Sequence, residues 1–311
     1  MHKISVVTPC YNEEENVEEL YVKVRDIFHE LKGYSYEHIF IDNASYDKTL
    51  PILKRLALKD KNLKIIVNIK NFGHIRSPYY GLLQAKGNAV IFMASDFQDP
   101  PELIKTFISK WEEGYKIVIG VKDKSEENPA MFAIRKLYYL LIKKFSYGVR
   151  QIGNFTGFGL YDRSFVNILK TLNEPYPYLR GLVADYGVEL AEVEFTQPER
   201  KKGVSKNNLY TLFDMAMLGF VSYSMVPLRI ATFFGFCASA VSFLIAIIYF
   251  IYKIIFWNRF QLGIAPIIIG FFFLFSIQLF FIGIMGEYVG AVFTQVKGRP
   301  LVIEKERINF N

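Results

Sequence analysis

The sequence predicts a doubly wound α/β domain followed by interfacial helices and a two-helix transmembrane hairpin. Short apolar runs alternate with amphipathic segments over residues 3–120, which is typical of parallel strands joined by helices. Polar side chains follow several of these runs, as ligand-binding residues do in open α/β sheets. Residues 230–252 and 260–286 contain no charged side chain, and each run is long enough to cross a hydrocarbon layer of about 30 Å.

The first part of the chain supplies the strands and helices of the α/β domain. The apolar runs predict strands at residues 3–9, 38–41, 64–67, 89–93 and 116–120. Helices are expected between them, at residues 13–31, 48–58, 74–85 and 101–113. Three glutamates open the first of these helices, which suits the positive end of a helix dipole.

The fourth apolar run ends in an acidic segment that contains Asp96, Gln98 and Asp99. Two prolines follow, and because proline fixes φ and lacks an N–H group, the strand cannot continue through them. The three polar side chains carry hard oxygen atoms of the kind that Mg²⁺ or Mn²⁺ takes beside substrate phosphates. The alternative is a helix cap in a solvated turn, because aspartate caps helices well.

Two other predicted strands also end in polar residues. Tyr-Asn-Glu stands at residues 11–13, and Asp42 and Asn43 follow the second strand. Carboxylates at neighbouring strand ends are placed to hold a nucleoside and a metal-bound diphosphate, although Asp42 also suits a simple helix cap. The sequence lacks a Gly-x-Gly-x-x-Gly motif and a phosphate-loop lysine, which disfavours a dinucleotide dehydrogenase and a phosphate-loop NTPase.

The net charge of +7, from 37 basic and 30 acidic residues, indicates an anionic partner. Basic residues flank the long apolar runs, which favours a membrane surface over a nucleic acid. These residues are Lys201, Lys202, Lys206 and Arg229 before the runs, and Lys297, Arg299, Lys305 and Arg307 after them. Cys10 and Cys237 lie far apart, and the four histidines lack metal-ligand spacing, so neither a disulfide framework nor a zinc site is indicated.

The segment before the apolar runs is mostly amphipathic or basic. Residues 130–145 have apolar positions at helical spacing with four basic residues, which suits a membrane-surface helix or a solvated helix face. Residues 153–163 are glycine-rich and lead into a helix. Residues 200–206 form a basic loop that either clamps phosphate oxygens or supplies charge beside a membrane. Residues 209–225 carry one charge and predict an interfacial helix.

These segments predict four parts of the chain. They are the cytoplasmic α/β domain (1–206), an interfacial amphipathic helix (207–226), the transmembrane hairpin (227–288, with helices at about 229–253 and 261–286) and a cytoplasmic tail (289–311). Two crossings place the domain and the tail on one side of the membrane, and the heavier basic flanks place that side in the cytoplasm. We expect no cleavable signal peptide, because a strand pattern begins directly after the first residues.

Five short motifs occur in order along the chain. They are Ser5-Val-Val-Thr-Pro-Cys-Tyr-Asn-Glu-Glu14, Asn71-Phe-Gly-His74, Asp96-Phe-Gln-Asp-Pro-Pro-Glu102, Gly203-Val-Ser-Lys206, and Gly286-Glu-Tyr288 with Arg299-Pro-Leu301. Together they resemble family 2 glycosyltransferases of the polyprenyl-phosphate type, the group of dolichyl-phosphate mannose synthases and bactoprenol glucosyl transferases. The resemblance covers nearly the whole chain and implies a GT-A (Rossmann-like) domain with a two-helix anchor.

This resemblance implies inverting transfer of a sugar from a nucleotide sugar to a polyprenyl (undecaprenyl) phosphate at the cytoplasmic face of a bacterial-type membrane, for an envelope glycan. It implies that Asp96 and Gln98 bind Mg²⁺ or Mn²⁺ on the diphosphate. It places the nucleotide sugar against Pro9, Tyr11, Glu13, Asp42 and Asn43, and phosphates against Arg200, Ser205 and Lys206. Membrane lipid, a flippase and a second copy of the chain are candidate partners.

Three positions depart from the pattern of the family. The family usually carries Asp-x-Asp-x-Gln and Asp-Phe-Arg-Leu, whereas this chain has Ala94 at the first Asp, and Gly157 and Gly159 in the second motif. A metal carboxylate, a candidate base and a phosphate-facing arginine are therefore absent. The reaction does not require that base, because a lipid phosphate monoester has a second pKa of about 6 and is largely ionised at neutral pH.

Asp162 and Asp185 are the acidic residues nearest in sequence to the altered motif, so both are candidates for a catalytic role beside Asp96. The alternative for Asp162 is a helix cap or a pair with Arg163. The three departures leave two other functions open. One is transfer to a hydroxyl of a lipid-linked sugar, which requires a true base, and the other is a non-catalytic membrane scaffold that binds nucleotide sugar.

Overall fold

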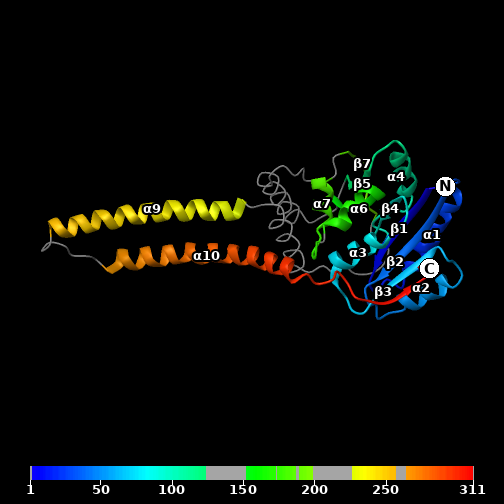
Figure 1. Cartoon of the computed structure of the whole chain (residues 1–311), viewed down its shortest axis with the longest axis horizontal. Helices are drawn as coiled ribbons and strands as arrows, with labels where there is room; N and C mark the ends of the chain where they lie inside the picture. Colours follow the sequence, from blue (N-terminus) through cyan, green and yellow to red (C-terminus); the bar gives the residue numbers. More distant parts are fainter. Residues whose placement is uncertain are drawn as a thin grey trace.

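A mixed β-sheet runs through the centre of the domain (Figure 1). The computed structural model describes residues 2–123, 152–172, 174–186, 189–198, 226–256 and 264–310. In these residues the strand order is β7-β5-β6-β4-β1-β2-β3-β8. The strands are β1 (His2–Cys10), β2 (Tyr34–Asp42), β3 (Leu63–Asn68), β4 (Ala89–Phe92), β5 (Ile117–Lys122), β6 (Phe155–Asp162), β7 (Leu190–Phe195) and β8 (Glu304–Ile308).

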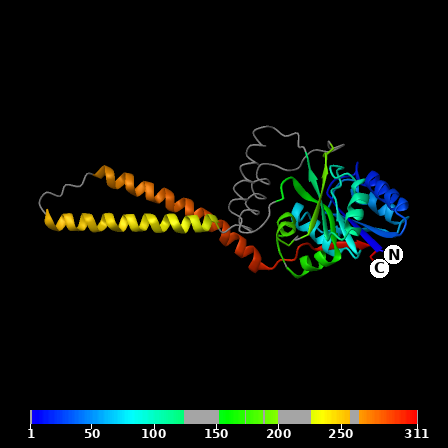
Figure 2. The same cartoon turned by 90° about the horizontal axis from the view of Figure 1, so that it is seen from above.

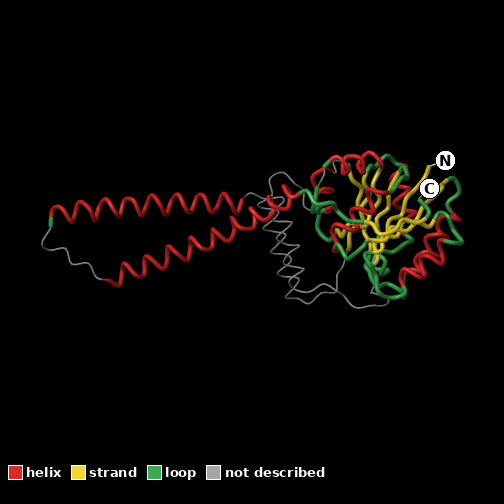
Figure 3. The backbone as a smooth tube through the Cα atoms, turned by 60° about the horizontal axis from the view of Figure 1, so that its bottom comes forward, coloured by secondary structure: helices red, strands yellow, loops and turns green. Residues whose placement is uncertain are grey.

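Helices cover both faces of this sheet, as the red and yellow tubes of Figure 3 show. They are α1 (Val17–Glu30), α2 (Thr49–Ala57), α3 (Gly73–Gln84), α4 (Leu103–Glu112), α6 (Arg163–Thr171) and α7 (Leu179–Tyr186). Alternate residues of a strand point to opposite faces, so Val6 packs with the core under α1, α2 and α4, and Val7 packs with the core under α3, α6 and α7. The predicted doubly wound α/β fold is confirmed.

The four strands β4, β1, β2 and β3 are parallel and adjacent, as the sequence predicts. Ile4 of β1 lies opposite Ala89 of β4 on one side and Tyr36 of β2 on the other. Parallel strands joined by crossover helices all end at the same edge of the sheet. The polar residues that follow β1, β2 and β4 are therefore brought to one edge.

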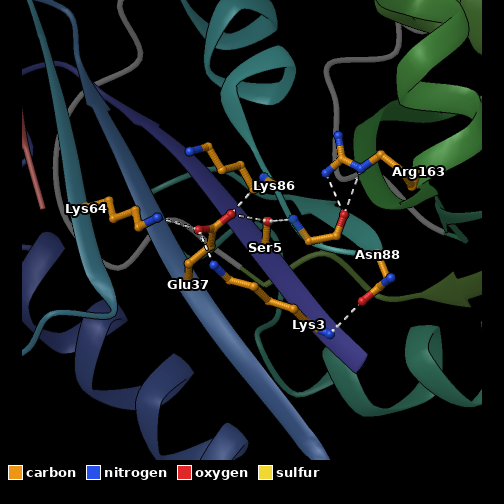
Figure 4. Close-up of polar contacts among 8 residues, drawn as sticks. Lys3, Ser5, Glu37, Lys64, Lys86, Asn88 and Arg163 are labelled. Atoms are coloured by element: carbon orange, nitrogen blue, oxygen red, sulfur yellow. Dashed lines mark hydrogen bonds and ion pairs between the residues drawn. The ribbon is translucent and has the colours of Figure 1, made fainter. Parts of the chain in front are cut away.

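A buried ionic network joins the same strands nearer their amino-terminal ends (Figure 4). The carboxylate of Glu37 on β2 forms ion pairs with Lys3 Nζ and Lys64 Nζ, each at 2.7 Å. It also accepts hydrogen bonds from Ser5 Oγ (2.6 Å) and from the backbone N–H of Lys86 (2.8 Å). The network fixes β1, β2, β3 and the turn before β4 relative to one another, and so supports the opposite edge where the polar residues gather.

Strands β6, β7 and β8 are absent from the elements that the sequence predicts. β6 occupies the glycine-rich residues 153–163 and pairs antiparallel with both β4 and β5. Gly159 allows this pairing, because a Cβ atom there would lie 2.4 Å from the carbonyl oxygen of Val118. β8 is a charged five-residue strand that pairs antiparallel with β3. The sheet is therefore mixed rather than wholly parallel.

The two apolar helices leave the domain together and extend far from it (Figures 1 and 2). They are α9 (Val226–Ile255) and α10 (Ile264–Lys297). By length and composition they can span a membrane over Leu228–Tyr252 and Phe273–Lys297, and neither span is buried inside the protein. The predicted pair of apolar helices is present, but α10 continues to Lys297 instead of ending near residue 286.

Residues 289–311, predicted as a tail, divide between the end of α10 and strand β8. The chain returns from α10 to the sheet, where the N–H group of Ile69 donates a hydrogen bond to the carbonyl of Ile303 (3.0 Å). Both chain ends consequently lie at the far end of the domain from the helical pair (Figure 2). The predictions for residues 130–145, 200–206 and 209–225 lie outside the described residues.

Candidate functional site

A cleft of about 580 Å³ opens at the carboxyl edge of the parallel strands. The ends of β1 and β4, the residues that follow β1, β2 and β4, and the first turns of α3 form most of its walls, and Lys122, Thr156 and Gln197 complete them. Six residues that the sequence predicts for a nucleotide-sugar or metal site line this cleft: Pro9, Tyr11, Glu13, Asn43, Asp96 and Gln98. They come from distant parts of the chain and meet because parallel strands end at a common edge.

The loop after β1 is held by hydrogen bonds to the loop after β2. The N–H group of Asn12 donates to Ser45 Oγ (2.9 Å), and the N–H group of Tyr46 donates to Asn12 Oδ1 (2.9 Å). Asn12 has a φ of 55°, which is in the left-handed region that asparagine tolerates. The ring of Tyr11 lies edge-on to the ring of Tyr46, with 6.1 Å between centroids. These contacts hold Tyr11 at the cleft.

Asn43 positions the loop that opens α3. Its Nδ2 group donates to Asn71 Oδ1 (2.8 Å) and to the carbonyl of Gly73 (3.1 Å). Its Oδ1 accepts from the N–H of Phe72 (2.9 Å) and from Asn68 Nδ2 (3.1 Å). An amide side chain has two donors and two acceptor positions, and all four are occupied here. Asn43 therefore fixes a wall of the cleft, and its predicted direct contact with a nucleotide gains no support.

Asp42 does not line the cleft, contrary to its predicted place in the nucleotide-sugar site. Its side chain is fully buried, and its Oδ2 accepts a hydrogen bond from the N–H of Ser45 (3.2 Å). Burial raises the pKa of this carboxyl above its ordinary value. The structure thus supports the alternative of a local cap, in which Asp42 shapes the loop that carries Asn43.

The acidic segment after β4 folds into a tight turn at the cleft. Asp96 Oδ1 accepts from the N–H of Gln98 (3.2 Å), and Asp99 Oδ2 accepts from the N–H of Ala94 (2.8 Å). Phe97 has a φ of 62°, and its ring is buried in the core beneath α1 and α4. Because Phe97 points inward, its two neighbours Asp96 and Gln98 remain on the cleft side of the turn.

The oxygen atoms of Asp96 and Gln98 fit a divalent cation of the Mg²⁺ or Mn²⁺ type. Both side chains line the cleft, and carboxylate and amide oxygens are the hard ligands that such ions prefer. Among the described residues, no group of three or more His, Cys, Asp or Glu side chains could hold a metal by itself. An ion here would therefore complete its coordination with substrate phosphate oxygens and water, as Mg²⁺ commonly does.

Asp99 supplies a further carboxyl group to the cleft. The sequence predicts it only as a third residue with metal-type oxygen atoms, beside Asp96 and Gln98. It lines the cleft and is buried, and burial, with a further contribution from the Asp96 carboxylate, raises its pKa to about 6. Lys122 lines the same cleft at the end of β5. Lys122 could have been found by the signal that identifies Asp96. Each is a polar residue a few positions beyond a predicted strand.

Asp162 lies at the other edge of the sheet from the cleft. It pairs with Ala89, the first residue of β4, because β6 runs antiparallel to β4. It caps α6 by accepting from the N–H of Ser164 (2.9 Å) and also accepts from Trp111 Nε1 (2.7 Å). Burial alone would raise the pKa of Asp162, but these hydrogen bonds lower it overall. These contacts favour the alternative of a helix cap, and a catalytic role for Asp162 gains no support. Asp185 is exposed on α7 and does not line the cleft, so its catalytic role gains no support.

Gly157 occupies the position where the resembling family carries an aspartate. A Cβ atom there would lie 3.6 Å from the Phe92 ring and 3.8 Å from Leu179, and the backbone has a φ of +105°. The space beside Gly157 is therefore bordered by apolar side chains. The predicted phosphate-binding residues lie outside the described part of the chain; they are Arg200, Ser205 and Lys206.

Comparisons with known proteins agree with the motifs. The family model described as glycosyl transferase family 2 matches residues 5–167. The SfII prophage-derived bactoprenol glucosyl transferase of Shigella flexneri is 34% identical over 98% of this chain and 98% of its own length. The uncharacterized glycosyltransferase sll0501 of Synechocystis sp. is 34% identical over 97% and 94%. A crystal structure of a mycobacterial protein is 18% identical over 71% of this chain and 73% of its own, with a TM-score of 0.50, which is a likeness of fold.

Proposed function

Because the chain belongs to glycosyl transferase family 2, we propose that it moves a sugar, with inversion, from a nucleotide sugar to a polyprenyl phosphate. The acceptor class is supported by relatives named bactoprenol glucosyl transferases, which match this chain over almost their whole length. Such a match includes the apolar helices as well as the sheet domain. The product is a sugar joined to a lipid phosphate, suited to the modification of an envelope glycan.

The observation that carries this proposal is the composition of the cleft. It brings Tyr11 and Glu13 from the end of β1 beside Asp96 and Gln98 from the end of β4. An aromatic ring suits a nucleobase, and the two oxygen-bearing side chains suit a metal-bound diphosphate. A single cleft thus has the parts for both ends of a nucleotide diphosphate.

Asp96 and Gln98 would hold the divalent cation together with the diphosphate of the donor. When bound, such an ion supplies neutralisation of the charge that develops on the leaving diphosphate. The protein itself positions the donor. The hydrogen bonds of Asn43 to residues 71–73 and of Asn12 to the loop after β2 hold the cleft walls before substrate arrives, which lowers the cost of reaching a reactive geometry.

The chemistry of the acceptor explains why the cleft does without a base at Gly157. An ionised phosphate oxygen of the acceptor attacks the anomeric carbon, and the bond from that carbon to the donor's β-phosphate oxygen breaks. The nucleoside diphosphate leaves with the bonding electrons, and no proton needs to be removed from the attacking oxygen. The apolar contacts of Gly157 with Phe92 and Leu179 are compatible with such an acceptor.

The two apolar helices support a reaction at a membrane surface. Figure 1 shows α3 and α7 at the end of the domain nearest α9 and α10, and the chain ends at the opposite end. The edge of the sheet that carries the cleft accordingly faces the helical pair. We propose the bacterial inner membrane, with residues 1–206 and the returning strand β8 on its cytoplasmic side. A flippase partner and self-association stay predictions.

The test uses the purified full chain in detergent with a panel of nucleotide sugars. We expect consumption of a donor only when undecaprenyl phosphate and Mg²⁺ or Mn²⁺ are both present. Asp96→Asn should lower the rate about 100-fold or more, because the cation that would neutralise the leaving diphosphate loses its carboxylate ligand. Asp26→Asn is the matched control, since Asp26 pairs with Arg25 on the exposed face of α1. No donor consumed by the parent protein, with nucleotide-sugar binding intact, would favour a non-catalytic scaffold.

A second candidate function is transfer to a hydroxyl of a lipid-linked sugar. The buried Asp99 carboxyl favours it, because this group lines the cleft and could accept a proton from an alcohol. The two functions differ in acceptor and in the role of Asp99. Transfer to a polyprenyl-linked sugar but not to undecaprenyl phosphate, abolished by Asp99→Asn with donor binding retained, would replace the first proposal by the second.

A further inference from the structure

A small annexe of about 80 Å³ adjoins the main cleft. We define the annexe by its lining residues, of which His74, Pro78, Phe92 and Thr156 also line the main cleft. The remaining wall comes chiefly from residues 177–180, which lead into α7. Because the two spaces share four residues, a molecule in the annexe would lie directly beside a donor bound in the cleft.

The walls of the annexe are mostly apolar. Phe92, Leu179 and Pro177 contribute rings and aliphatic groups, and the hydroxyl of Tyr79 is occupied because it donates to the carbonyl of Leu169 (3.0 Å). A Cβ atom on Gly157 would point at Phe92 and Leu179. Because glycine has no side chain, position 157 contributes no carboxylate beside these two residues. An anion entering the annexe would therefore meet no repelling negative charge from position 157.

Arg180 is the cation of the annexe. It is half-buried, and its guanidinium lies 6.0 Å from the centre of the Tyr178 ring. Among the described residues, no carboxylate lies within ion-pair distance of Arg180. A guanidinium group presents several N–H donors in a planar fork that matches phosphate oxygens. Arg180 is thus a partly desolvated guanidinium at the end of an apolar wall, and within the described part of the chain no acidic side chain pairs with it.

The annexe also lies on the side of the domain that is nearest the two apolar helices, where a lipid would approach. It is bounded by α3 and the start of α7, and these two helices are at the end of the domain nearest α9 and α10 (Figure 1). A ligand anchored in a membrane beside these helices would reach the annexe before the distal parts of the sheet.

We propose that the annexe binds the head of the acceptor, with Arg180 paired to its phosphate monoester and the wall formed by Phe92, Pro177 and Leu179 against the first apolar carbons of its chain. The assignment rests on the proposed transfer to a polyprenyl phosphate and deepens it, because it names where the acceptor phosphate is held.

The experiment measures binding to the full chain in detergent, with farnesyl phosphate as the probe. Arg180→Met should weaken farnesyl phosphate binding about tenfold or more, because hydrogen bonds to a charged group are lost. Arg180→Lys should recover part of the affinity, since lysine keeps the charge but not the fork. Farnesol and inorganic phosphate are the two partial probes: we expect both to bind more weakly than farnesyl phosphate, and farnesol to be insensitive to Arg180→Met.

Two controls separate this site from the donor site and from the fold. Nucleoside diphosphate affinity should change less than about twofold in Arg180→Met, and Arg55→Ala, an exposed arginine paired with Glu18, should leave both affinities as in the parent. If Arg180→Met proves unstable by thermal melting, Arg180→Gln replaces it. Unchanged farnesyl phosphate affinity, equal loss of nucleotide affinity, or no farnesyl phosphate binding by the parent would overturn the assignment.

The outcomes also distinguish this assignment from the proposed function. Binding of farnesyl phosphate that depends on Arg180, together with absence of sugar transfer to any polyprenyl phosphate, would support the site and refute the reaction. Sugar transfer with an acceptor KM that is unaffected by Arg180→Met would support the reaction and refute the site. A raised acceptor KM with an unchanged donor KM would support both.

Discussion

Glu37 Oε2 lies 2.7 Å from Lys64 Nζ on the neighbouring strand, and the same carboxylate oxygen lies 2.7 Å from Lys3 Nζ. The Glu37 side chain is 1% exposed and that of Lys64 is 10% exposed. One buried carboxylate therefore compensates two lysines. Because buried charges are costly without partners, the three side chains depend on one another. They lie away from the cleft, so changes to them should affect stability before chemistry.

Replacing Glu37 by glutamine should destabilise the protein strongly. Glu37→Gln leaves Lys3 and Lys64 without their charge partner, and we expect a loss of about 2–4 kcal/mol in the free energy of unfolding. Denaturant unfolding of the full chain in detergent measures this. Glu30→Gln is the control, because Glu30 pairs with Lys105 on the surface. We expect this substitution to lower the free energy of unfolding by less than about 1 kcal/mol. Equal stability of the two variants would contradict this account of the network.

Acid should act on the same network. Burial alone would raise the pKa of Glu37, but hydrogen bonds from Lys3 and Lys64 lower it to about 2 from an ordinary value of 4.5. A depressed folded-state pKa gives stability that is present above the unfolded value and is lost as pH falls from 4.5 towards 2. We expect Glu37→Gln to lack this component of acid denaturation, measured as the midpoint of unfolding against pH.

His38 should produce a separate loss of stability at milder pH. Burial lowers its pKa to about 3 from an ordinary value of 6.5, so the folded protein keeps it neutral while the unfolded chain binds a proton. Stability should therefore fall by up to about 1.4 kcal/mol for each pH unit below 6.5, until the folded value is reached. His38→Gln should remove this slope. The comparison with the parent cancels the opposite contribution of Asp99, whose pKa is raised.

Asn43 should affect catalysis through the loop that it holds. Asn43→Ala removes four hydrogen bonds to residues 68–73, and a cleft wall displaced by a fraction of an ångström should lower kcat/KM roughly tenfold. In Asn43→Asp the carboxylate can still accept the hydrogen bond from the N–H of Phe72, so kcat/KM should fall less than in Asn43→Ala. Steady-state kinetics with the donor varied measures both. An Asn43→Ala protein with unchanged donor kinetics would refute the positioning role.

The C-terminal strand should stabilise the domain. Asn309 Nδ2 donates to the carbonyls of Ala57 (2.9 Å) and Leu63 (2.9 Å), so this residue fastens the end of β8 to α2 and β3. We expect Asn309→Ala to lower the free energy of unfolding by about 1–3 kcal/mol. Removal of residues 303–311 should lower the free energy of unfolding further and promote aggregation, because it exposes the edge of β3. Lys305→Ala, at an exposed position of the same strand, should behave as the parent protein.

The parallel half of the fold was predictable because its signals are local. Each strand from β1 to β5 is an apolar run, and Asp96 and Gln98 directly follow one of them. The gathering of Tyr11, Glu13, Asp96 and Gln98 in one cleft then follows from parallel pairing alone. Their roles in binding stay predictions, whereas their common location is confirmed.

The remaining errors have one physical origin, which is strand direction and long-range pairing. Asp162 follows a strand as Asp96 does, but β6 is antiparallel to β4, and its carboxyl end is therefore at the other edge. No local pattern gives the direction of a strand. β6 was hidden because glycine weakens a strand signal, and here Gly159 is required by the close approach of Val118. β8 is charged along most of its length, and only its pairing with β3 makes it a strand.

Strand β8 has a consequence for how the protein is made. It follows the helical pair in the sequence, and it covers the edge of β3, which precedes that pair. On the ribosome the nascent domain must keep that edge uncovered until α9 and α10 have been synthesised. The sheet is thus completed only after both helices have been synthesised, and a polypeptide that stops short of β8 would retain an open edge that quality-control proteases and chaperones can recognise.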